Sequence, residues 1–166
     1  LPAKIGDFPV VSLASNAFIN NDLLARVVIP DSVTTLGTNV FSGCDWLNTV
    51  IIGEGVTAIP DKAFFGCDSL NMVVLPDSVR KIGDLAFSQC ASLLCVVIPE
   101  STIVISKNAF DYGNKQLTIV GADESYAQTY AAANKIKFAI RATLVKNDVD
   151  GNGTFNIVDA RKAVRL

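Results

Sequence analysis

Residues 148–159 place oxygen-bearing side chains at the spacing of a calcium-binding loop. The six ligand positions are occupied by Asp148, Asp150, Asn152, Thr154, Asn156 and Asp159. In such a loop Thr154 supplies its backbone carbonyl, Asn156 binds directly or through water, and Gly153 allows the sharp turn. Three carboxylates in so short a segment would repel one another without a cation. The pattern therefore predicts calcium as a cofactor and outweighs the alternative of a plain hairpin turn at residues 150–153.

Cysteine is the other residue type in this chain that could bind a metal, form a disulfide or act as a nucleophile. Cys44, Cys67 and Cys90 follow one another at a constant spacing, and Cys95 stands apart. The chain has no histidine and no Cys-x-x-Cys pair, so neither zinc binding nor a base-activated thiol is expected. We predict small thiols buried in a core ladder, with a disulfide between neighbouring repeats as the alternative. No other residues suggest a nucleophile, base and oxyanion hole, and the chain is predicted not to be an enzyme.

The composition is that of a protein with a well-buried core. Half of the 166 residues are hydrophobic and 18% are charged, which argues against disorder. The net charge is −2 and the 14 basic residues are scattered, so no nucleic-acid partner is expected. Apolar runs are short, so no membrane span is expected. The chain begins at Leu1 without a leader, and we interpret it as either a mature or a trimmed fragment in which a native targeting signal is not visible.

The chain contains an internal repeat of 23 residues. This repeat determines the secondary-structure elements that hold the cysteines and the other residues of the core. Five phenylalanines and five aliphatic residues share its spacing. They are Phe18, Phe41, Phe64, Phe87 and Phe110, with Leu13, Leu36, Ile59, Ile82 and Ile105. One unit buries too little apolar surface to fold alone, so successive units must stack around a continuous core. The predicted repeats lie near residues 4–26, 27–49, 50–72, 73–95 and 96–118.

Each unit contains one clear strand. The pattern Leu-x-x-Val-x-Ile, as at Leu24, Val27 and Ile29, ends in the alternation of a β-strand, and β-branched residues suit a pleated surface. Proline follows in three of the units and ends the strand, because it lacks a backbone donor. The remainder of the unit is short and predicts turns or a single helical turn.

These motifs resemble the BspA-like type of leucine-rich repeat. The unit of that family runs from a strand through Pro-x-Ser-Val, Ile-Gly and Ala-Phe to Cys-x-x-Leu, and residues 29–33, 82–83, 63–64 and 67–70 match these parts. The resemblance covers about residues 10–138. It implies an α/β-type leucine-rich-repeat solenoid with a parallel β-strand ribbon. It also implies an extracellular or cell-surface protein of bacterial type, used for adhesion or protein recognition and not for catalysis.

A helix is predicted at residues 123–134, after the last repeat. Asp123 is a suitable N-cap, Asn134 can end the helix, and Tyr126 and Tyr130 lie on one face. We interpret this helix as a C-terminal lid over the solenoid. The domain division that follows is a capped solenoid at residues 1–140, then a linker and calcium loop-helix at residues 141–166.

Strand residues between the core positions must point out of the solenoid, because side chains alternate across a strand. They are Val28, Ile51, Val74 and Val97, flanked by Arg26, Thr49, Met72 and Cys95. One interpretation is a binding patch for a protein partner, since contiguous exposed apolar surface usually marks a contact. The other is that β-branched ladders stabilise stacked strands whether or not anything binds.

The tail resembles the first half of a type I dockerin, in which such a calcium loop is followed directly by a helix, here at residues 159–166. Dockerins use two loop-helix units to bind cohesin modules of cellulosome-type or related surface assemblies. The resemblance implies that Ile157, Val158, Val164 and Arg165 would face the partner. Cohesin is therefore an expected partner where the native protein carries the second half.

Two functions are consistent with these features. The first is a non-catalytic extracellular recognition module, carried on a cellulosome-type or surface assembly through its dockerin. The alternative is a stand-alone surface adhesin that binds host or plant matrix through the solenoid face. Binding that survives deletion of residues 145–166 would favour the second.

Overall fold

The structure, a computed structural model, describes residues 1–111, 113 and 115–141. Its elements are β1 (Lys4–Ile5), β2 (Phe8–Pro9), β3 (Ser12–Leu13), β4 (Arg26–Ile29), β5 (Thr35–Leu36), β6 (Thr49–Ile52), β7 (Ala58–Ile59), β8 (Met72–Val74), β9 (Lys81–Ile82), β10 (Cys95–Val97), β11 (Val104–Ile105), β12 (Thr118–Gly121), α1 (Tyr126–Ala133) and β13 (Lys137–Ile140). The predicted calcium loop and the helix after it lie outside the described residues. Ile157, Val158, Val164 and Arg165 also lie there.

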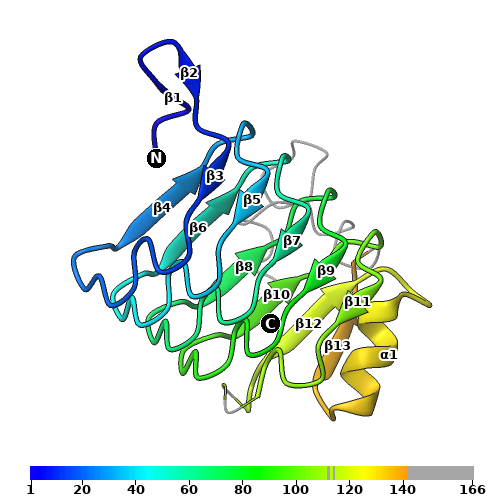
Figure 1. Cartoon of the computed structure of the whole chain (residues 1–166). Helices are drawn as coiled ribbons and strands as arrows, with labels where there is room; N and C mark the ends of the chain where they lie inside the picture. The colour runs from blue at the N-terminus through cyan, green and yellow to red at the C-terminus, as the bar shows by residue number, and fades with distance from the viewer. Residues whose placement is uncertain (112, 114, 142–166) are drawn as a thin grey trace, which may run out of the picture.

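The strands form two parallel ribbons along a solenoid, with an antiparallel β1–β2 hairpin at its N-terminal end (Figure 1). The ribbon of longer strands, called the main ribbon here, holds β4, β6, β8, β10, β12 and β13. The short-strand ribbon holds β3, β5, β7, β9 and β11. Val27 pairs with Val50 and Val96 with Ile119, so one repeat makes one coil. The predicted parallel solenoid is confirmed, and turns form the third side of each coil.

A stack of phenylalanine rings runs through the core. The rings of Phe41, Phe64 and Phe87 are completely buried, and neighbouring rings have centroids 5.3–5.5 Å apart with planes nearly parallel. Such spacing between parallel rings means that they are offset, which is a favourable aromatic geometry. The stack extends to Phe18 at one end and Phe110 at the other. The 23-residue spacing of phenylalanine in the sequence therefore corresponds to one continuous column of stacked rings in the structure.

Backbone hydrogen bonds hold the turn side of neighbouring coils together. The N–H of Phe41 donates to the carbonyl of Ala63, and that of Phe64 to Ala86, each at 2.9 Å. Two positions in each of four coils adopt left-handed backbone. They are Asn16, Asn39, Lys62 and Leu85, and Asn20, Gly43, Gly66 and Gln89. Because the unusual φ recurs at the same place, the turns have matching shapes and can stack.

Helix α1 closes the C-terminal end of the column. The ring of Tyr130 lies 6.0 Å from that of Phe110 at a tilt of 59°, and its hydroxyl donates to the carbonyl of Lys107 at 3.0 Å. Burial raises the pKa of Tyr130 to about 12, which keeps this donor protonated. The predicted N-cap was wrong: the Ser125 hydroxyl, and not Asp123, accepts from the helix. The predicted end at Asn134 is confirmed.

Candidate protein-recognition surface

The outward face of the main ribbon is open in its first coils and covered in its later ones. Val28 and Ile51, which pair across β4 and β6, are 38% and 42% exposed. Val74 is half-buried, and Val97 is only 1% exposed. The prediction of one exposed apolar stripe through all four residues is therefore wrong for Val97. An open apolar surface remains at the N-terminal part of the ribbon.

The buried part of this face is a second, smaller hydrophobic cluster. Its buried members are Met72, Cys95, Val97 and Val120, with Val74 and Ala139 packed against them. Met72 pairs with Cys95 across β8 and β10, and Val97 pairs with Val120 across β10 and β12. Outward side chains on neighbouring strands thus pack on one another, and the apolar residues here stabilise the fold.

Two further exposed apolar residues lie in the turns that lead into β4 and β6. Leu23 and Trp46 are 95% and 66% exposed, and they lie one repeat apart in the turns before β4 and β6. Together with Val28 and Ile51 they form what we call the ribbon patch. Sequence reasoning missed Leu23 and Trp46, although both precede the repeated core leucine at the 23-residue spacing. Trp46 matters most, because tryptophan is enriched among residues that dominate protein interfaces.

Carboxylates flank the ribbon patch at both ends of its strands. Asp22 and Asp45 adjoin Leu23 and Trp46, while Asp31 and Glu54 follow the ends of β4 and β6. All four are exposed, and the backbone N–H of Glu54 donates to the Asp31 carboxylate at 2.9 Å. These four residues, called the acidic rim, lie before and after β4 and β6, and Arg26 is the one basic residue of these two strands.

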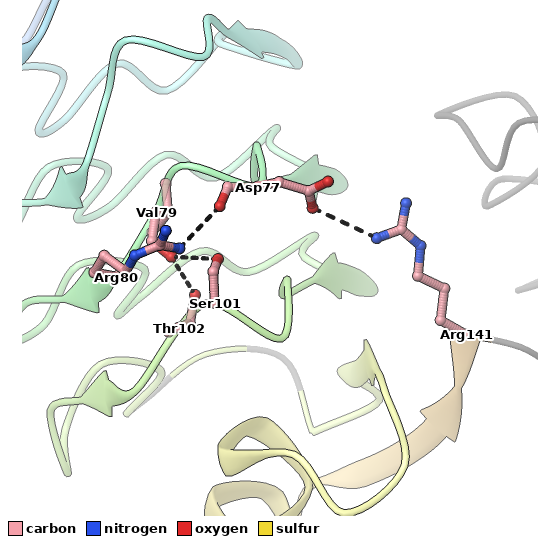
Figure 2. A network of polar contacts seen from close by, with 6 residues as sticks. All are labelled: Asp77, Val79, Arg80, Ser101, Thr102 and Arg141. Atoms are coloured by element: carbon pink, nitrogen blue, oxygen red, sulfur yellow. Dashed lines mark hydrogen bonds and ion pairs between the residues drawn. The ribbon is translucent and has the colours of Figure 1, made fainter.

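The same row of acidic residues continues to the far end of the ribbon. Figure 2 shows Arg141, directly after β13, with its Nη1 3.8 Å from Oδ1 of Asp77. In the adjoining coil the hydroxyls of Ser101 and Thr102 both donate to the carbonyl of Val79 at 2.9 Å. Within residues 1–111, 113 and 115–141 the acidic rim has no such ion pair. The rim carboxylates are therefore among the acidic groups of the solenoid that are accessible to a basic partner.

The cysteines lie in the core as free thiols and not as bridges. Cys44, Cys67, Cys90 and Cys95 are all buried, which confirms the predicted core location. The first three donate from Sγ to the carbonyls of Phe18, Phe41 and Phe64 at 3.0–3.2 Å. Burial raises the pKa of Cys90 to about 12 and that of Cys95 to about 12. Protonated, enclosed thiols of this kind pack and donate hydrogen bonds but do not act as nucleophiles.

In the described part of the chain, no three histidine, cysteine or acidic side chains come together as a metal site. That part likewise contains no helix with the length and apolar character needed to cross a membrane. What the described part of the solenoid does present is a surface with an apolar centre and an acidic edge.

A family model for the BspA type leucine-rich repeat region matches residues 9–137 in six copies. The chain belongs to the BspA-type leucine-rich-repeat family. Its coils carry the family pattern on the main ribbon, the turn side and the phenylalanine column alike. Five repeats and a lid were predicted, whereas the family model matches six copies, which together reach the start of β13.

Solved structures of similar proteins have the same fold. A leucine-rich-repeat protein of T. pallidum is 28% identical with a TM-score of 0.69, and the alignment covers 100% of this chain and 81% of that one. A leucine-rich cell surface protein of Faecalibacterium prausnitzii is 31% identical with a TM-score of 0.68, over 76% of this chain and 33% of that one. A Bacteroides ovatus leucine-rich-repeat protein is 26% identical with a TM-score of 0.63, over 72% and 38%. This chain thus spans about a third of the length of the last two, and curated proteins yielded no match.

Proposed function

We propose that this chain is a non-catalytic protein-recognition module of a bacterial cell surface and that the ribbon patch is its contact surface. The observation that carries the proposal is the exposure of Leu23, Val28, Trp46 and Ile51 on two adjoining coils. Exposed apolar side chains grouped in this way usually mark a site of association. The cell-surface location is supported by the description of the Faecalibacterium relative as a cell surface protein.

The acidic rim indicates the chemistry of the partner. An apolar contact at Trp46 and Ile51 would supply most of the binding energy, because water is excluded there. Lysine or arginine residues around the partner's apolar centre would face Asp22, Asp45, Asp31 and Glu54. Complementary charges at a rim chiefly raise the association rate and the dependence on salt. The expected partner is therefore a protein with an apolar epitope and a basic surround.

The ribbon patch can be tested by surface plasmon resonance with the whole chain over a panel of immobilised extracellular-matrix proteins. For any protein bound, Trp46→Ala is expected to weaken affinity by about 2 kcal/mol, roughly 30-fold. Asp45→Asn and Glu54→Gln are expected to lower the association rate and flatten its dependence on salt, with a smaller effect on dissociation.

The matched control for this experiment is Ile103→Asp. Ile103 is 64% exposed, close to the 66% of Trp46, but lies on a coil away from the patch. Its replacement should leave affinity unchanged, whereas Ile51→Asp should abolish binding. Affinity that survives Trp46→Ala and Ile51→Asp would place recognition elsewhere on the solenoid.

We further propose that residues 141–166 attach the solenoid to a larger assembly through a calcium-dependent, dockerin-like unit. Support comes from the ligand pattern of Asp148, Asp150, Asn152, Thr154, Asn156 and Asp159. Calorimetric titration of calcium into the chelator-stripped chain is expected to reveal one bound ion. Asp148→Ala should abolish that binding, because the first carboxylate of such a loop is a direct ligand. A plain turn would give no binding heat in either protein.

A surface adhesin is the second candidate, supported by the ribbon patch alone. The two functions make different demands on the tail. An adhesin needs only the solenoid, so ligand binding would survive deletion of residues 145–166. A tethered module would lose its attachment to a cohesin-bearing surface in the same deletion while keeping its recognition of the partner.

A further inference from the structure

The outward face of the main ribbon differs in burial between coils that have the same lateral neighbours. Ile51 pairs with Val28 on one side and lies one repeat before Val74 on the other, yet it is 42% exposed. Val97 lies between Val74 and Val120, and it is 1% exposed. Since β-branched residues flank both positions, lateral packing along the ribbon does not explain why Val97 is buried.

A layer of side chains resting on the sheet explains burial of this kind. Side chains stand roughly perpendicular to a sheet, so their tips are shielded only by groups that lie over them. In the part of the chain that the structure describes, every apolar member of the second cluster belongs to the main ribbon. The buried residues of α1 belong instead to the main core, and the β1–β2 hairpin lies at the opposite end of the solenoid (Figure 1). Neither of these two elements therefore covers the cluster.

The chain is held against these coils where it leaves β13. Arg141 directly follows β13 and pairs with Asp77 of the β8 coil, although β12 and β10 lie between the two strands (Figure 2). Arg141 also lines one hollow with Ile98 and Ala122, which directly follow β10 and β12. The chain after β13 thus starts at the ends of the strands that carry the second cluster.

The next residues have the apolar character that a covering layer needs. Leu144 and Val145 come three and four residues after Arg141, and an extended chain covers about 10–14 Å in that number of residues. Val97 is the last residue of β10, so its side chain lies close to the strand ends. Phe155 adds a large apolar side chain further along the sequence.

The charges of the two parts of the chain are complementary. Residues 141–166 carry five basic and three acidic residues, a net charge of +2, whereas residues 1–140 carry nine basic and 13 acidic residues, a net charge of −4. Asp77, Glu100 and Asp123 are exposed and follow β8, β10 and β12 at the repeat spacing. Asp77 already pairs with Arg141, and Lys146 is the next basic residue. Opposite charges of this kind favour contact between the segment and the ribbon.

We infer that residues 142–166 fold back over the main ribbon and cover the second hydrophobic cluster, with Leu144 and Val145 against Val97. The segment thereby closes the later coils of the ribbon and leaves the ribbon patch as the open part of the same face. The occupant is this chain's own segment because the Arg141 ion pair directs it there and its charge is complementary. The inference rests on neither calcium binding nor partner recognition, so each of the three can fail without the others.

The first test uses Cys95, an outward residue of the second cluster, as a probe in the whole chain. N-ethylmaleimide is added under native conditions, and peptide mapping by mass spectrometry follows each thiol with time. In the native chain Cys95 is expected to react as slowly as Cys67, which lies in the main core. The double substitution Leu144→Asp and Val145→Asp should raise the rate at Cys95 at least roughly tenfold, because carboxylates are strongly disfavoured against apolar side chains. The rate at Cys67 should not change.

The matched control for the thiol measurement is Ile103→Asp. It places the same charge just before β11, on the other ribbon, and should leave Cys95 protected. An unchanged rate at Cys95 in the double variant would overturn the inference. So would protection that weakens on dilution, because a second copy of the chain would then be the cover.

Limited trypsin digestion of the whole chain tests the same contact from the ribbon side. Cleavage after Lys146 is expected to be slow in the native chain and clearly faster in Val97→Asp. Val28→Asp is the matched control, because Val28 has the same place in its unit but is already exposed, and cleavage should stay slow in this variant. Circular dichroism checks that both variants keep the solenoid. Equal cleavage in the native chain and in Val97→Asp would contradict a docked segment.

Discussion

Replacing Phe64 by alanine is expected to lower the free energy of unfolding by about 3–5 kcal/mol. Phe64 is completely buried in the middle of the phenylalanine column, with rings on both sides at 5.5 Å and 5.3 Å. The substitution removes the ring from two aromatic contacts at once. It also leaves a cavity that the stacked backbone cannot close, because hydrogen bonds fix the distance between coils.

Urea unfolding followed by circular dichroism measures this loss. Phe8→Ala is the matched control, because it removes the same ring from a site that is 79% exposed. The control should change the free energy of unfolding by less than about 0.5 kcal/mol. Equal losses in the two variants would mean that the column does not stabilise the solenoid as its packing indicates.

Gly83→Ala is expected to destabilise the solenoid by about 2–3 kcal/mol, because a side chain there would collide with the preceding coil. A Cβ at Gly83 would lie 2.6 Å from the backbone N of Asp61 and 2.8 Å from the carbonyl carbon of Pro60. Both atoms belong to the backbone and cannot move without shifting a coil. The same spacing that lets Asp61 accept a hydrogen bond from Asp84 at 2.8 Å therefore excludes a methyl group.

The control for Gly83 is Gly113→Ala, measured by the same urea unfolding. Among the described residues, the backbone atom nearest to a Cβ there would be the carbonyl oxygen of Phe110, at 3.3 Å. Alanine normally restricts the unfolded chain and stabilises by about 0.4–1 kcal/mol where it fits. The two substitutions should therefore differ in magnitude and can differ in sign. A neutral Gly83→Ala would show that neighbouring coils separate more easily than their hydrogen bonds indicate.

For the C-terminal lid, the sequence predicted a helix but not the residue at which the helix begins. The segment with Tyr130 and Asn134 has helix-forming residues in a run, so a helix after the last repeat was foreseeable. Its start was not, because Glu124 adopts left-handed backbone with φ 56° and Ser125 takes over the cap. Tyr126 and Tyr130 lie one helical turn apart in α1, as expected, but they differ in burial: Tyr130 seals the column, whereas Tyr126 is 45% exposed. That difference depends on where the last coil ends.

The solenoid itself was determined by the sequence. A strict period in Phe41, Phe64 and Phe87, with strand alternation in each unit, leaves few ways to bury every apolar residue except in stacked coils. The tertiary structure alone decided which outward residues stay open. Val28 and Val97 occupy the same place in their units, yet one is exposed and the other is buried in a second cluster. The physical reason is that alternation along a strand fixes only the direction of a side chain, whereas its exposure depends on residues that are distant in the sequence and meet it only after the coils have stacked.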